Sequence, residues 1–174
     1  CSALQPYVLL RCCPAGDDSV NDLSAATAAA AEGLEIAQWA GDTWIGALIQ
    51  HALAASYILA GRHEVGLETL AGALAAFRSA GDTFGRAATR LWQGLAYYGL
   101  HERPQLATVL DDLLSLCEAN GYDYLLTTPT LLGPPDPRRL VPLLIHARNL
   151  RLHTAYVARI LALMGLSEIQ VHPG

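Results

Sequence analysis

The sequence has no lysine, one methionine and two phenylalanines among its 174 residues, so arginine supplies every basic side chain other than histidine. No apolar run approaches the roughly 18 residues that a membrane-spanning helix needs. The first residues also lack the basic and apolar segments of a signal peptide. We therefore expect a cytoplasmic protein with no membrane contact.

Cysteine is scarce too, with four copies at positions 1, 12, 13 and 117. Adjacent cysteines rarely pair with each other, and the set lacks the spacing of metal ligands. We therefore expect reduced thiols and no metal site. A chain that opens at Cys1 is either an excised fragment or a processed lipoprotein, and the truncated-looking residues 1–20 favour the fragment.

The motifs of common catalytic sites are missing as well. The sequence contains no phosphate-binding loop, no Gly-x-Ser-x-Gly turn and no His-Glu-x-x-His zinc motif. The neighbouring Asp111 and Asp112 would point apart on a helix rather than share a proton. Without a set of acid, base and nucleophile, we expect no catalytic residues and no cofactor, and an enzyme is the least favoured interpretation.

What the sequence has in abundance is alanine and leucine, which dominate a hydrophobic content of 52%. These are the strongest apolar helix formers. Apolar residues recur with the helical period between residues 21 and 119. We expect an all-α protein with more than about 65% helix, against about one third in an average globular protein.

A forty-residue repeat organises this helical pattern. The segment AGDTW at 40–44 recurs as AGDTF at 80–84 and, more loosely, as NGYDY at 120–124. Tyr57 and Tyr97 keep the same spacing. In each unit the glycine suits the left-handed end of one helix, and the Asp or Thr after it suits the cap of the next. The expected helices are 21–39, 44–60, 64–79, 84–100 and 104–119.

The repeat divides the chain into four parts. Residues 1–20 form a truncated or degenerate first repeat, and residues 21–125 form the helical repeats. Four prolines in the connection 126–137 exclude a helix interior there. Residues 138–174 are expected to form a C-terminal hairpin of two helices, at about 138–148 and 154–165, and a linker.

The hairpins resemble the tetratricopeptide repeat, in which a small residue stands three positions before a tyrosine on the first helix. Ala54 with Tyr57 and Gly94 with Tyr97 match this pattern, as do further small residues at Gly61, Gly66 and Ala73. The period of forty instead of thirty-four and the missing proline after the second helix depart from it. The resemblance implies an α-α superhelix of helical hairpins with a concave groove lined by first helices.

Longer repeats of this kind are similar to those of large bacterial transcription regulators of the maltose-regulon-activator family. Residues 124–137, YLLTTPTLLGPPDP, and the final His172-Pro173-Gly174 resemble regulators of the antibiotic-regulatory type, in which a winged-helix domain follows. This resemblance implies a non-catalytic domain that senses a ligand or binds a protein. The alternative is a general peptide-binding scaffold unconnected to transcription.

Side chains that differ between repeats are the first candidates for a binding site. Three large or charged residues replace their counterparts forty positions earlier. They are Trp92 for Ala52, Tyr98 for Ile58 and Arg90 for Gln50. We expect them to contact a peptide, a protein or a small-molecule effector in the groove; the alternative is packing between helices.

Three residues of the preceding repeat complete the candidate site, namely His51, Gln50 and Trp44. His51 is expected on the groove side of its helix, either touching a ligand or hydrogen-bonded within the core. The open ends of the repeat array could also pair with a second copy of the chain.

Charge is unevenly placed. Residues 1–135 carry six Arg against fourteen Asp and Glu, a net charge of −8, whereas residues 136–174 carry a net charge of +3. The second tail helix offers only Arg159 to a DNA groove, and a recognition helix needs several such groups. We expect no specific DNA binding by this chain; the tail hairpin docks on the repeats or on a neighbouring domain.

Overall fold

The computed structural model describes residues 19–166, with side chains from residue 23 onward. Of these residues 80% are helical and none is in a strand, which confirms the all-α prediction. None of the described helices is long and apolar enough to cross a membrane. The helices are α2 (Ser19–Ala40), α3 (Thr43–Leu59), α4 (His63–Ser79), α5 (Thr83–Gly99), α6 (Arg103–Asn120), α7 (Asp123–Thr127), the 3₁₀ helix η2 (Pro137–Leu140), α8 (Val141–Asn149) and α9 (Thr154–Leu163).

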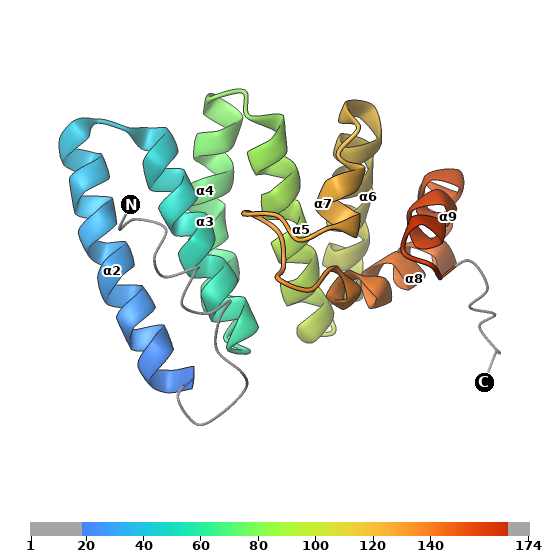
Figure 1. Cartoon of the computed structure of the whole chain (residues 1–174), viewed down its shortest axis with the longest axis horizontal. Helices are drawn as coiled ribbons and strands as arrows, with labels where there is room; N and C mark the ends of the chain where they lie inside the picture. Colours follow the sequence, from blue (N-terminus) through green and yellow to red (C-terminus); the bar gives the residue numbers. More distant parts are fainter. Residues whose placement is uncertain (1–18, 167–174) are drawn as a thin grey trace.

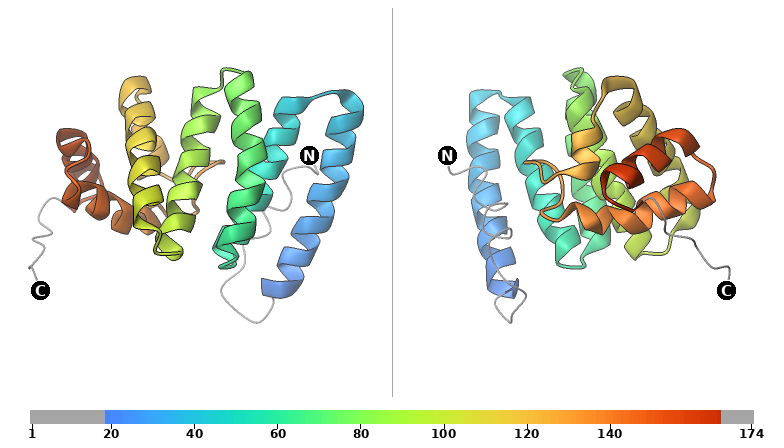
Figure 2. Two further views of the ribbon diagram at one scale, coloured as in Figure 1. Left: turned by 180° about the vertical axis from the view of Figure 1, so that it is seen from behind. Right: turned by 45° about the vertical axis from the view of Figure 1, so that its right-hand side comes forward.

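Consecutive helices pack as antiparallel pairs, as the predicted α-α superhelix requires. They stand side by side from α2 at one end to the α8–α9 hairpin at the other (Figures 1 and 2). A continuous core of buried hydrophobic side chains runs from α3 to α9. The proposed first repeat at 1–20 falls almost entirely outside the described residues.

The turns between repeats follow the expected chemistry. Gly41, Gly81 and Gly121 all adopt a left-handed conformation, with φ of 69°, 68° and 69°. Asp42 accepts a hydrogen bond from the backbone N–H of Ile45, and Asp82 accepts one from Gly85, so both carboxylates cap the following helix.

The third repeat departs from the first two because its first helix is cut short. Helix α7 has only five residues. Thr128 is extended, with φ of −130° and ψ of 154°, as expected for a residue before proline. The chain then continues without regular structure to Pro137, and this segment, residues 128–136, is called the strap below.

The C-terminal hairpin packs on the repeats. Helix α8 contacts α5 and α6, and Leu143 fits over Gly94, where an added Cβ would lie 3.5 Å from the leucine Cδ1. Tyr156 donates a hydrogen bond to Asp123 at the start of α7, and Arg159 forms an ion pair with the same carboxylate. The arginine singled out as a possible DNA contact is therefore paired within the fold.

Candidate functional site

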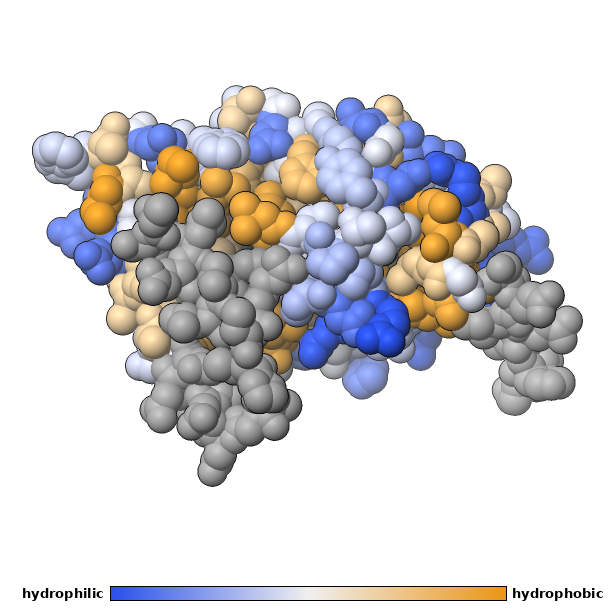
Figure 3. Space-filling model, viewed as in Figure 1, coloured by the Kyte–Doolittle hydropathy of each residue, from blue (hydrophilic) through white to orange (hydrophobic). Residues whose placement is uncertain are grey.

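The strap lies across the first helices of the repeats, in the position where a groove was expected. It passes in front of α5 (Figure 1). Leu132, Gly133 and Pro134 are buried, whereas Leu131 is half exposed. The middle of this face has pale, weakly polar surface, while apolar surface gathers toward the N-terminal helices and over the C-terminal hairpin (Figure 3). The chain itself therefore occupies this part of the groove.

One backbone carbonyl holds the strap in place. The indole Nε1–H of Trp92 donates to the carbonyl oxygen of Leu132 over 2.7 Å. His51 Nε2 lies 3.0 Å from the same oxygen. A buried loop must find partners for its polar backbone groups, and here two side chains from different repeats supply them.

His51 is neutral in this environment. Its side chain is fully buried, and burial lowers its pKa from 6.5 to about 4 because the imidazolium would lose its hydration. The Leu132 oxygen only accepts, so Nε2 carries the proton. The other nitrogen, Nδ1, lies 3.4 Å from the hydroxyl of Thr89, which donates its own proton to the carbonyl of Gly85.

The six residues expected at the site do not form one surface. Trp92 and His51 converge on the strap and are fully buried, so both lie in the core. Arg90 binds Asp112 of α6 over 2.7 Å and donates a second hydrogen bond to Gln93. That any of these residues binds an external ligand stays a prediction.

The other three residues expected at the site lie apart from the strap and from one another. The indole of Trp44 is 43% exposed and donates to Asp82, the cap of α5. Gln50 lines a pocket of about 420 Å³ between α2, α3 and α4, where its side-chain oxygen lies against Gly72. Tyr98 is 44% exposed and lines a different pocket, between α5, α6 and α8.

Sequence reasoning missed the main partner of the site. The groove side chains bind a backbone carbonyl at Leu132, and Arg90 pairs with the Asp112 carboxylate of α6. The only sequence feature that pointed to this segment was the group of prolines after residue 128. It predicted irregular structure, but not that the segment would lie across the first helices.

In the described part of the chain, no three His, Cys, Asp or Glu side chains lie close enough together to hold a metal ion. Burial raises the pKa of the Cys117 thiol to about 12, so this cysteine is protonated at neutral pH and is a poor nucleophile.

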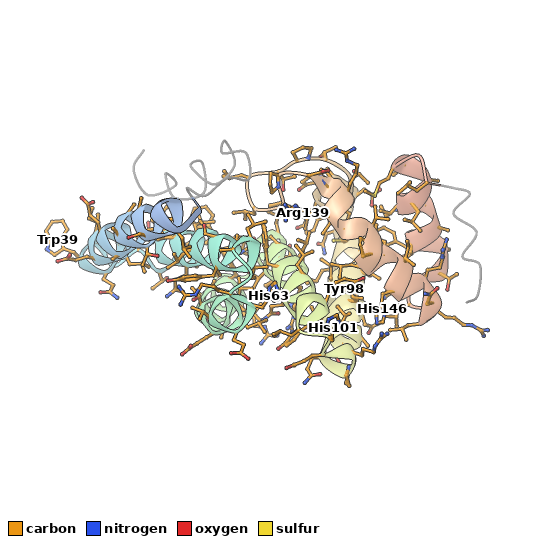
Figure 4. All side chains as sticks on the ribbon, turned by 90° about the horizontal axis from the view of Figure 1, so that it is seen from below. Trp39, His63, Tyr98, His101, Arg139 and His146 are labelled. Carbon is orange, nitrogen blue, oxygen red and sulfur yellow. The ribbon has the colours of Figure 1, made fainter. Side chains whose placement is uncertain are left out.

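The N-terminal edge leaves apolar side chains in solvent. Trp39, at the end of α2, points away from the other helices (Figure 4) and is 91% exposed. Ile36 is 60% exposed. Pairing of this edge with a second copy stays a prediction.

Comparisons with protein-family models, with curated proteins and with solved structures found no match to this chain.

Proposed function

We propose that this chain is a non-catalytic regulatory domain of a bacterial transcription regulator, in which the repeats control the position of the C-terminal hairpin. The observation that supports the proposal most directly is the pair of hydrogen bonds from Trp92 and His51 to the Leu132 carbonyl. They join two repeats to the segment that leads into α8 and α9.

The strap occupies the groove and leads directly into the C-terminal hairpin, so displacing the strap from the groove also affects the position of the hairpin. A peptide, protein or small effector that used Trp92 and His51 must first displace Leu132. A ligand shifts a conformational equilibrium by its difference in affinity for the two states. Such a ligand would therefore favour a state in which the strap, and with it α8, is released from α5.

The filled groove also favours this role over that of a general peptide-binding scaffold. A scaffold binds its peptides in an open groove, and here the chain's own strap already satisfies the buried polar groups of the first helices. The resemblance of residues 124–137 to regulators of the antibiotic-regulatory type points the same way, since the strap lies within that stretch.

The test uses the complete gene product and a promoter–reporter assay. Trp92→Phe removes one donor to Leu132, which shifts the strap equilibrium by about fivefold and should change transcription to a similar extent. Trp44→Phe is the matched control, because it removes an indole donor that binds Asp82 instead of the strap. Equal effects of the two variants, or a reading frame that ends at Gly174 without a winged helix, would exclude the proposal.

A further inference from the structure

A second pocket lies where α8 closes over the turn between α5 and α6. It measures about 290 Å³, near the lower limit of small-molecule sites. Its lining residues are Tyr98, His101, Arg103, Leu106, Pro142, Ile145, His146 and Asn149. Figure 4 shows Tyr98, His101 and His146 close together near the middle of this view, on the side away from Arg139.

The charged and titratable residues that line this pocket are all basic or aromatic. It includes an arginine and two histidines, and no acidic side chain is among the lining residues. Arg103 is exposed, and within residues 23–166 no carboxylate pairs with it. Leu106, Pro142 and Ile145 supply an apolar surface beside these polar groups.

His146 has a nitrogen without a partner at this site. Its Nε2 atom is buried and makes no hydrogen bond. A buried polar atom left unpaired is costly and rare in folded proteins. Burial and the positive charge of Arg103 both lower the pKa of His146. An anion beside Arg103 would offset its positive charge, and a turn of the His146 ring toward the pocket would give Nε2 an acceptor.

The pocket is also where the second repeat departs from the first. Tyr98 stands forty residues after Ile58, which is buried in the core, whereas Tyr98 is 44% exposed at the pocket. His101 corresponds to Gly61, and both adopt a left-handed conformation, with φ of 60° and 78°. Glycine reaches this conformation without strain, while histidine does so at a cost. Tyr98 and His101 thus place polar side chains where the first repeat has none.

We propose that this pocket binds a small carboxylate ligand with an aromatic or branched aliphatic body. The guanidinium of Arg103 holds the carboxylate in a charge-assisted pair. The His146 ring, turned toward the ligand, and the Tyr98 hydroxyl donate further hydrogen bonds, and the body of the ligand packs on Pro142 and Ile145. This site is separate from the strap, and the proposal holds whether or not the chain belongs to a transcription regulator.

The test is a titration of the complete chain followed by the NMR signals of the histidine rings. Phenylacetate is the probe, and phenylacetamide and phenethylamine have the same ring with a neutral or positive group. Phenylacetate should give saturable shifts of His146 and His101, whereas the other two should give none. Inorganic phosphate carries negative charge but has no apolar group, so it should bind more weakly than phenylacetate.

Arg103→Gln should weaken phenylacetate binding by about tenfold, the effect of losing one charge-assisted hydrogen bond. Arg139→Gln removes the same charge from an exposed position outside the pocket and should leave the affinity unchanged. Circular dichroism verifies that both variants fold. Equal affinity for phenylacetate and phenylacetamide, equal effects of the two arginine substitutions, or phosphate binding as tight as that of phenylacetate would each overturn the proposal.

Discussion

The indole nitrogen of Trp92 donates a hydrogen bond to the carbonyl oxygen of Leu132, forty residues further along the chain. His51 reaches the same oxygen from the preceding repeat. This contact gives a structural role to the tryptophan that replaces Ala52 of the first repeat, because its indole N–H reaches the strap and an alanine side chain has no donor.

The first prediction concerns Trp92 itself. Because the side chain is fully buried, Trp92→Ala should lower the free energy of unfolding by about 3–5 kcal/mol. Trp92→Phe keeps much of the apolar volume and should cost about 1–2 kcal/mol, mainly through the lost hydrogen bond. Urea unfolding followed by circular dichroism measures both. A loss below about 1 kcal/mol for Trp92→Ala would show that the indole does not belong to the core.

The second prediction concerns pH. The pKa of His51 is about 4 in the folded protein and 6.5 when the ring is in water. Between these values the unfolded chain binds more protons, so acid favours unfolding. The contribution is fully present above pH 6.5 and is lost as the pH falls toward 4, a change of about 3 kcal/mol.

His51→Gln is the control for this titration, because glutamine keeps an N–H donor for Leu132 but does not titrate. Chemical unfolding at pH 7 and pH 4.5 should show a smaller loss of stability for this variant than for the original chain. The same loss in both proteins would assign the pH dependence to other groups.

The third prediction compares one substitution at two glycines in the first turns of α3 and α5. A Cβ at Gly85 would lie 2.5 Å from the ring of the buried Phe77, so Gly85→Ala should destabilise the protein by about 1–3 kcal/mol. At Gly46 the nearest atom would be Ala37 Cβ at 4.0 Å, and Gly46→Ala should stabilise by about 0.5–1 kcal/mol. Thermal unfolding decides the sign, and changes in the same direction at both sites would contradict the packing described here.

The fourth prediction is that this chain binds DNA weakly and without sequence preference. Residues 1–135 carry a net charge of −8, and Arg159, the only basic group within α9, is paired with Asp123. Fluorescence anisotropy with promoter and scrambled duplexes should give similar affinities, weaker than about 10⁻⁶ M at physiological salt. Selective binding near 10⁻⁸ M would instead identify the α8–α9 hairpin as a DNA reader.

Local chemistry in the sequence was enough to predict the helices and their turns. The forty-residue spacing placed Gly41, Gly81 and Gly121 at helix ends, and the structure confirms all three. Pro129 correctly marked the end of regular repeats, because proline and the residue before it exclude helix locally. Such features depend on interactions within a few residues, which a sequence displays directly.

The path of the strap, and the fact that it fills the groove, depend on tertiary structure alone. His51 and Leu132 are 81 residues apart, and the atom that joins them is a backbone oxygen, which every residue possesses. No side-chain pattern therefore distinguishes Leu132 from its neighbours as the acceptor. The pocket at Tyr98 likewise exists only because α8 lies over the α5–α6 turn. The sequence alone determined which segments are helices. Only their packing decided that the chain's own strap fills the groove, because this depends on the burial of one carbonyl between two side chains that are far apart in the sequence.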